Sequence, residues 1–157
     1  MATAHSLSDE ILATLVANAG DAVIVADASG VIRFWNAAAV RMFGHTEQDA
    51  LGASLDIIIP EKLQERHWDG FRHTMATGET KYGERLLAVP AHRADGTRIS
   101  VEFTVTLLPD SNGEILGIAA ILRDVTARWE EQRALQRRLQ ELERDLQPSA
   151  GATAGQG

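Results

Sequence analysis

The chain of 157 residues contains no cysteine. This absence excludes disulfide bonds, thiolate metal sites, iron–sulfur clusters and cysteine nucleophiles. Positive charge is scarce as well, because 15 Lys and Arg stand against 22 Asp and Glu, for a net charge of −7. Binding to a nucleic-acid backbone needs a cationic surface, so the composition argues against a general nucleic-acid binder.

Long apolar runs are also missing. No run approaches the roughly 18–20 residues that span a bilayer. Residues 1–6 lack the basic-then-apolar order of a signal peptide. From these two absences we predict a cytoplasmic protein without membrane association.

Catalytic motifs are absent from the sequence. It contains no HExxH, Walker loop, GxGxxG or GxSxG motif, and no His/Asp/Glu cluster at metal-ligand spacing. Four histidines are scattered and are expected on the surface: His5, His45, His73 and His92. We therefore expect a protein that is not an enzyme.

The chain divides into four segments by composition. Residues 1–19 form a polar tail followed by apolar residues at helical spacing, and Gly20 ends that helix. Residues 20–124 are the main domain, in which strand-like and helix-like stretches are separated by turns. Residues 125–147 are charged and helical. Residues 148–157 are small and are predicted to be disordered.

The main domain has an α+β pattern. Two strands, 22–26 and 31–35, precede helices expected around 36–43, 46–51, 55–59 and 60–77, and three strands follow at 81–89, 99–107 and 114–123. Residues 99–107 alternate apolar and polar side chains, which is typical of a sheet with one buried face. We predict a five-stranded antiparallel sheet with helices on one face.

This pattern resembles the PAS domain family over about residues 20–126. The resemblance rests on the order of several short motifs: Trp35-Asn36, Met42-Phe43-Gly44-His45, Leu51-Gly52, Ile59-Pro60, Ala76-Thr77-Gly78-Glu79, Asp95-Gly96-Thr97, Gly117-Ile118-Ala119 and Arg123-Asp124-Val125-Thr126. PAS domains are sensor and dimerisation modules. The resemblance therefore implies signal transduction through a ligand pocket between sheet and helices.

His67 is the main candidate for holding a cofactor. In the helix 60–77 it shares one face with three apolar residues: Leu63, Phe71 and Met75. Counted back from Thr77, His67 falls where haem-PAS oxygen sensors, which this region resembles more weakly, place their axial histidine. The resemblance implies b-type haem with His67 on the iron, for gas or redox sensing. A core or rim histidine without a cofactor is the alternative.

Two positions depart from the haem sensors. Those sensors carry a strand arginine where this chain has Leu87, and a helix arginine where it has His73. The sheet side of the pocket is expected from Phe103, Val105 and Ile118, for which ordinary core packing is the alternative.

Flavin adenine dinucleotide is a less favoured cofactor. Flavin-binding PAS domains use polar groups near the corner formed by Trp35 and Asn36, but the same pair is also ordinary in PAS sequences. The photoreceptors that form a cysteinyl-flavin adduct are excluded by the missing cysteine. Trp68 and Arg72 lie four residues apart, which allows a cation–π contact or a half-exposed structural aromatic.

The helix 125–147 carries a heptad pattern at six positions: Arg128, Gln132, Leu135, Leu139, Leu142 and Leu146. This spacing predicts a parallel coiled-coil homodimer, and a helix folded back on its own domain is the alternative. Asp124, Thr126 and Arg128 are expected to relay a change from the sheet into this helix.

Two functions remain open at this point. One is a ligand- or haem-binding PAS sensor whose output lies in a signalling partner or in a domain outside this sequence. The other is a cofactor-free PAS module that dimerises or docks on a kinase, cyclase or transcription regulator.

Overall fold

The computed structural model describes residues 7–80 and 87–146. Its elements follow the order α1 (Asp9–Ala17), β1 (Ala22–Asp27), β2 (Ile32–Trp35), α2 (Ala37–Phe43), α3 (Glu47–Ala50), the 3₁₀ helix η1 (Leu55–Ile57), α4 (Glu61–Thr77), β3 (Leu87–His92), β4 (Arg98–Pro109), β5 (Ile115–Asp124) and α5 (Thr126–Leu146). Two compact units divide at residue 125, and the second begins with α5. The predicted tail 148–157 and residues 1–6 lie outside the described residues.

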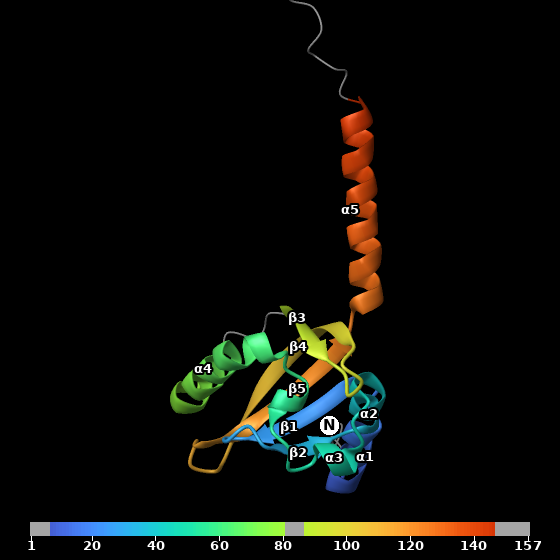
Figure 1. Ribbon diagram of the computed structural model, residues 1–157. Coiled ribbons are helices and arrows are strands. Elements are labelled where there is room, and N and C mark those ends of the chain that lie inside the picture. Colours follow the sequence, from blue (N-terminus) through green and yellow to red (C-terminus); the bar gives the residue numbers. More distant parts are fainter. Residues whose placement is uncertain (1–6, 81–86, 147–157) are drawn as a thin grey trace, which may run out of the picture. The chain divides into compact units, whose positions relative to one another are not determined.

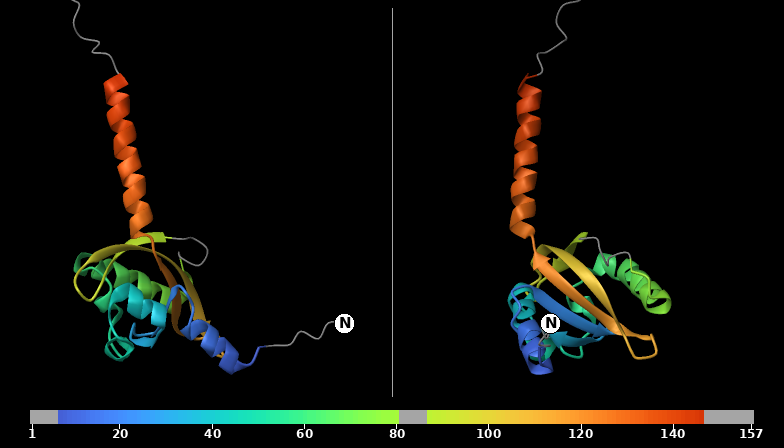
Figure 2. Two further views of the ribbon diagram at one scale, coloured as in Figure 1. Left: turned by 90° about the vertical axis from the view of Figure 1, so that its right-hand side faces the viewer. Right: turned by 180° about the vertical axis from the view of Figure 1, so that it is seen from behind.

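The five strands form one antiparallel sheet in the order β2-β1-β5-β4-β3 (Figure 1). This confirms the α+β prediction. The first and last strands pair at the centre, with Ile24 opposite Ala120 and Ala22 opposite Leu122. Helices α2, α3 and α4 lie on one side of this sheet, as the turned view in Figure 2 shows.

The alternation predicted for β4 determines which side chains face the helices. Ile99, Val101 and Val105 are buried, while Thr106 on the opposite face is exposed. The largest fully buried side chains are Trp35, Phe43, Ile32 and Val101. The rings of Trp35 and Phe43 lie 5.5 Å apart, so this pair joins β2 to α2 in the core.

Asn36 joins three elements through one buried amide group. Its Oδ1 accepts hydrogen bonds from the backbone N–H groups of Val23 and Ala39, at 3.0 and 2.9 Å. Its Nδ2 donates to the carbonyl oxygens of Val16 and Asp21, at 3.2 and 3.1 Å. Asn36 therefore caps α2 and ties both the end of α1 and the start of β1 to it.

Most predicted element boundaries differ from the structure by one or two residues, for example in β4, which was expected at 99–107 and spans Arg98–Pro109. The differences at β3 and η1 go further. Of the strand expected at 81–89, residues 81–86 lie outside the described residues, and β3 continues to His92 because its pairing with β4 extends to His92 opposite Arg98. The short helix expected at 55–59 is a 3₁₀ helix that ends at Ile57. Helix α4 begins directly after Pro60 and ends at Thr77, and the residue that follows, Gly78, has a φ of +70° that suits a glycine.

Candidate functional site

An apolar cavity of about 120 Å³ lies between the inner face of the sheet and helix α4. Its walls come from β1, η1, β3, β4 and β5, and from α4 through His67. Among the described lining residues, His67 is the one with a titratable side chain. The cavity can therefore accept an apolar ligand that makes one specific polar contact.

A second cavity of about 100 Å³ lies against the same helix. Phe71 and Val105 line it, and Arg66 and Thr74 add polar groups. His67, Phe103 and Ile118 line both cavities. The two cavities are therefore adjacent, with these three side chains in the walls of both.

The His67 imidazole is half-buried, and its Nδ1 has no hydrogen-bond partner within residues 7–80 and 87–146. Burial lowers the pKa of His67 below its ordinary value of 6.5, against an opposing attraction from the Asp56 carboxylate. The neutral imidazole is thus favoured near pH 7, and a neutral imidazole is the form that ligates metals. A buried nitrogen without a hydrogen-bond partner costs free energy, which makes this imidazole a candidate for contact with a ligand.

An aromatic cluster surrounds this imidazole on α4. The centroid of the His67 ring lies 4.8 Å from that of Trp68, edge-on, and 6.0 Å from that of Phe71. Trp68 Nε1 donates a 2.7 Å hydrogen bond to Asp56 Oδ1 in η1. Arg72 instead forms an ion pair with Asp69. The polar partner of Trp68 is therefore Asp56 and that of Arg72 is Asp69, in place of the cation–π contact considered between Trp68 and Arg72.

The other predicted pocket residues are placed as follows. Phe71 is buried on α4, and Met75 is partly buried against the core, but neither lines the first cavity. Leu63 is half-buried on α4 and lines neither cavity. Leu87 stands opposite Phe103 in the pairing of β3 with β4. Of the predicted set, the structure brings His67, Phe103 and Ile118 together at the first cavity.

Three of the histidines predicted on the surface lie in the described part of the chain: His45, His73 and His92. His73 is exposed, as expected. His45 is not a free surface residue: it is half-buried, its Nε2 lies 3.3 Å from the carbonyl oxygen of Ile57, and its ring contacts Trp35 edge-on. His92, the last residue of β3, is also half-buried.

The predicted relay residues lie on both sides of the boundary between β5 and α5 in the sequence. Asp124 is the last residue of β5, and its Oδ2 accepts a 2.8 Å hydrogen bond from Arg93 Nη2. Helix α5 begins at Thr126 and includes Arg128. Sequence reasoning missed Arg93, although its position beside the Asp95-Gly96 turn indicated a loop able to reach another strand end.

The predicted dimer residues lie on α5 and are exposed there. The exposed fractions of Leu135, Leu139, Leu142 and Leu146 are 65%, 58%, 52% and 79%. Large exposed leucines at heptad spacing leave an apolar stripe on this helix.

No described helix is long and apolar enough to cross a membrane. The described residues also contain no group of three or more His, Cys, Asp or Glu side chains placed to hold a metal ion. Among the described residues that line the first cavity, His67 supplies the metal-ligating side chain.

A protein-family model described as the PAS fold matches residues 10–125. The crystal structure of the PAS domain of a protein from Colwellia psychrerythraea has a TM-score of 0.66 and 19% identity, covering 75% of this chain and 97% of that one. This structural likeness supports the fold.

Three relatives are similar in sequence. An "Uncharacterized protein" of Azorhizobium caulinodans is 40% identical over 118 residues, which are 74% of this chain and 16% of that protein. Sensor protein FixL of Bradyrhizobium diazoefficiens is 32% identical over 126 residues, 80% of this chain and 24% of FixL. Oxygen sensor protein DosP of Escherichia coli is 25% identical over 95 residues, 60% of this chain and 12% of DosP. The matched parts are thus under a quarter of each relative's length.

Proposed function

Because this chain belongs to the PAS family, we propose that it is a sensory module that holds a small ligand or cofactor between α4 and the sheet. A b-type haem on His67 is the best specific candidate. The proposed domain spans residues 20–124, with the helix 125–147 as its output.

The observation that carries this proposal is the buried, unpartnered Nδ1 of His67 at an otherwise apolar cavity. The chemistry of this site fits an axial haem ligand, since the imidazole is held neutral and its neighbours are apolar. The ring orientation of a histidine is an assignment, so either nitrogen can be turned toward the ligand.

The first cavity, as it stands in this structure, suits a molecule smaller than a porphyrin. A dry cavity of about 150 Å³ holds a benzene molecule, and the first cavity is about 120 Å³. A porphyrin therefore requires the two cavities to join, with the side chains of Phe103 and Ile118 displaced. Other proposed walls of the enlarged pocket are Leu63, Phe71, Met75, Leu87 and Val105.

Bound haem would supply an iron atom that binds a diatomic gas. In that state His67 would hold the iron from the helix side, and Phe103 and Ile118 would exclude water from the opposite side. The similarity to DosP, which is named an oxygen sensor, and to the sensor protein FixL supports gas or redox sensing as the signal.

We further propose that the output runs through the C-terminal helix. Movement of β4 and β5 around a ligand would reach Asp124 at the end of β5, and then Thr126 and Arg128 at the start of α5. Leu135, Leu139, Leu142 and Leu146 would pair α5 with a second copy of the chain. A change in that pairing would act on a partner protein or on an output domain.

The test is an absorption spectrum of the protein purified after expression with haem supplied. We expect a Soret band in the wild type, its loss in His67→Ala, and its retention in His73→Ala, because His73 is exposed on the same helix. A colourless wild type would contradict the haem proposal. Absorption in the blue without a Soret band would indicate flavin instead.

A cofactor-free interaction module is the second candidate. It is favoured by the small size of both cavities, because the domain's own side chains already fill most of the space between α4 and the sheet. In this version the module dimerises or docks on a kinase, cyclase or transcription regulator. A colourless protein whose melting temperature is unchanged by added haemin would support it.

A further inference from the structure

Trp68 lies beside the cavities without lining either of them. Its indole is nevertheless held by two elements distant in sequence from α4. One is the turn between β1 and β2, and the other is the 3₁₀ helix η1.

The turn holds the indole through Gly30. This glycine has a φ of +79°, and a Cβ atom placed there would overlap Cη2 and Cζ3 of Trp68. The indole therefore lies directly against the backbone of the turn, in space that any side chain at position 30 would occupy.

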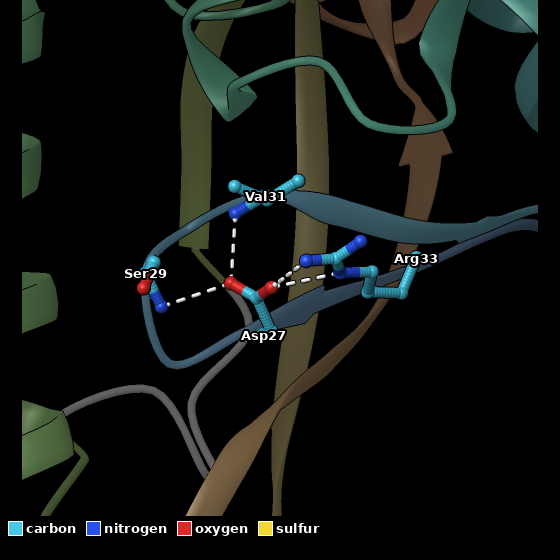
Figure 3. A network of polar contacts seen from close by, with 4 residues as sticks. All are labelled: Asp27, Ser29, Val31 and Arg33. Atoms are coloured by element: carbon cyan, nitrogen blue, oxygen red, sulfur yellow. Dashed lines mark hydrogen bonds and ion pairs between the residues drawn. The ribbon is translucent and has the colours of Figure 1, made fainter.

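The turn is itself fixed by Asp27 (Figure 3). Asp27 Oδ1 accepts hydrogen bonds from the N–H groups of Ser29 and Val31, at 2.9 and 3.1 Å. Asp27 Oδ2 accepts a 2.7 Å hydrogen bond from Arg33 Nε. These side-chain bonds come from residues 27–33 and not from α4, and they help to hold the backbone that meets the indole.

The second element holds the polar edge of the indole. Trp68 Nε1 donates a hydrogen bond of 2.7 Å to Asp56 Oδ1. Asp56 is held in turn, because its N–H donates to Ser54 Oγ, the side-chain cap of η1, at 3.2 Å. A hydrogen bond to a charged acceptor at this length is among the stronger ones in proteins.

The free side of the indole lies against the histidine. The Trp68 and His67 rings are edge-on with their centroids 4.8 Å apart, and Phe71 meets Trp68 edge-on at 5.4 Å. His67 Nδ1 has no hydrogen-bond partner in the described chain, and its ring contacts are with Trp68 and Phe71.

We propose that Trp68 is a positioning residue for His67: the β1–β2 turn and η1 fix the indole, and the indole holds the imidazole at the cavity. The consequence for ligand affinity rests on the proposed function, whereas the positioning itself does not. Residues that orient a metal-ligating histidine are worth about tenfold or more in metal affinity.

The chain offers a matched control for Gly30. Gly113, in the turn between β4 and β5, has a φ of +87°, and a Cβ atom placed there would meet nothing within 4 Å. The two turns also share their hydrogen bonds. Asp110 Oδ1 accepts hydrogen bonds from the N–H groups of Asn112 and Glu114. Asp27 Oδ1 accepts them from the equivalent residues, Ser29 and Val31. Gly30→Ala and Gly113→Ala therefore share the backbone strain, and only Gly30→Ala displaces the indole.

The first measurement uses the ligand-free protein. Ring currents from Trp68 should shift the ring-proton resonances of His67 in two-dimensional aromatic NMR spectra, with nuclear Overhauser contacts between the two rings. We expect Gly30→Ala to remove the contacts and the shift, and Gly113→Ala to keep both. Identical His67 resonances in wild type and Gly30→Ala would overturn the proposal, whether or not any cofactor binds.

The second measurement is the rate at which haemin leaves the protein for apomyoglobin. We expect about tenfold faster loss from Gly30→Ala and from Trp68→Leu, and an unchanged rate in Gly113→Ala. If Gly30→Ala does not fold, Trp68→Leu and its control Trp129→Leu, in the separate α5 unit, replace it. The readout of the first measurement is then the nuclear Overhauser contact between the His67 and Phe71 rings, which Trp68→Leu should weaken and Trp129→Leu should keep. An unchanged contact in Trp68→Leu would overturn the positioning. Equal haemin loss from Trp68→Leu and wild type would overturn the ligand consequence. A protein that takes up no haemin would overturn the proposed haem function. The NMR result alone would then test whether Trp68 positions His67.

Discussion

The guanidinium of Arg93 joins the last residue of the sheet to the helical side of the domain. Arg93 Nη2 donates to Asp124 Oδ2 at 2.8 Å, and Arg93 Nε donates to the carbonyl oxygen of Met42 at 3.0 Å. Both side chains are partly buried, with 37% of Arg93 and 29% of Asp124 exposed. One arginine thus connects α2, the β3–β4 turn and the end of β5, immediately before the chain enters α5.

Replacing this arginine should loosen the end of β5. We expect Arg93→Gln to lower the free energy of unfolding by about 1 kcal/mol, because a charged hydrogen bond is worth about 1.5–3 kcal/mol when buried and less when partly exposed. Urea unfolding measures the change. Arg98→Gln is the control, since Arg98 is exposed at the start of β4, and a loss as large in Arg98→Gln would contradict the assignment.

Filling the first cavity should separate ligand binding from stability. Ala120→Leu adds three carbon atoms to a lining residue of β5, so we expect haemin affinity to fall at least about tenfold. Stability should change by no more than about 1 kcal/mol, because added burial offsets the strain of overpacking. Titration with haemin and urea unfolding check both values.

The neighbouring position supplies the control for Ala120→Leu. Ala119 lies next in the same strand and therefore faces the opposite side of the sheet. Ala119→Leu should leave haemin affinity unchanged. Equal affinity for haemin in both leucine variants would mean that the ligand does not occupy this cavity.

The fold was predictable because its evidence is local. Alternation along residues 99–107, the glycine after each turn and the strand at 22–26 predict five strands without any knowledge of the tertiary structure. The strand β3 was the least well placed. This strand ends at His92 because His92 pairs with Arg98 of β4. The local sequence of β3 does not reveal this pairing.

The candidate site was predictable only in part. Helical spacing places His67 and Phe71 on one face, and strand alternation places Phe103 toward the helices. The bond from Trp68 to Asp56 and the contact of Trp68 with Gly30 join positions that are close only after folding. The volume of the cavity depends on how every lining side chain packs, so no local pattern predicts it.

Removing the imidazole should stabilise the ligand-free protein while removing its proposed function. His67→Leu replaces a buried nitrogen without a partner in the described chain, and such a group costs about 1–3 kcal/mol. We expect the free energy of unfolding to rise by about 1 kcal/mol and the Soret band to be lost. His73→Leu, at an exposed position of α4, should change stability by less than about 0.5 kcal/mol. A destabilised His67→Leu would mean that the imidazole is an ordinary, satisfied core group.

The same histidine should make the ligand-free protein sensitive to pH. Burial lowers the pKa of His67 in the folded state below 6.5. As the pH falls below about 6.5, the unfolded chain therefore binds a proton that the folded chain does not, and stability decreases. We expect the wild type to lose more stability than His67→Leu between pH 7.5 and 5.5, measured by urea unfolding at each pH. Parallel pH profiles would contradict the lowered pKa.

The apolar stripe of α5 should pair two copies of the chain. Leu139 and Leu142 are more than half exposed on this helix, and burying a leucine contributes about 1.5–3 kcal/mol. We expect the wild type to sediment as a dimer at micromolar concentration and Leu139→Glu with Leu142→Glu to sediment as a monomer, because the dissociation constant should rise more than about a hundredfold. Ala134→Glu with Gln140→Glu adds the same two carboxylates outside the heptad positions, so this variant should remain a dimer. A monomeric wild type would contradict the coiled coil. If both double variants were monomers, charge repulsion, and not loss of the leucine stripe, would explain the dissociation.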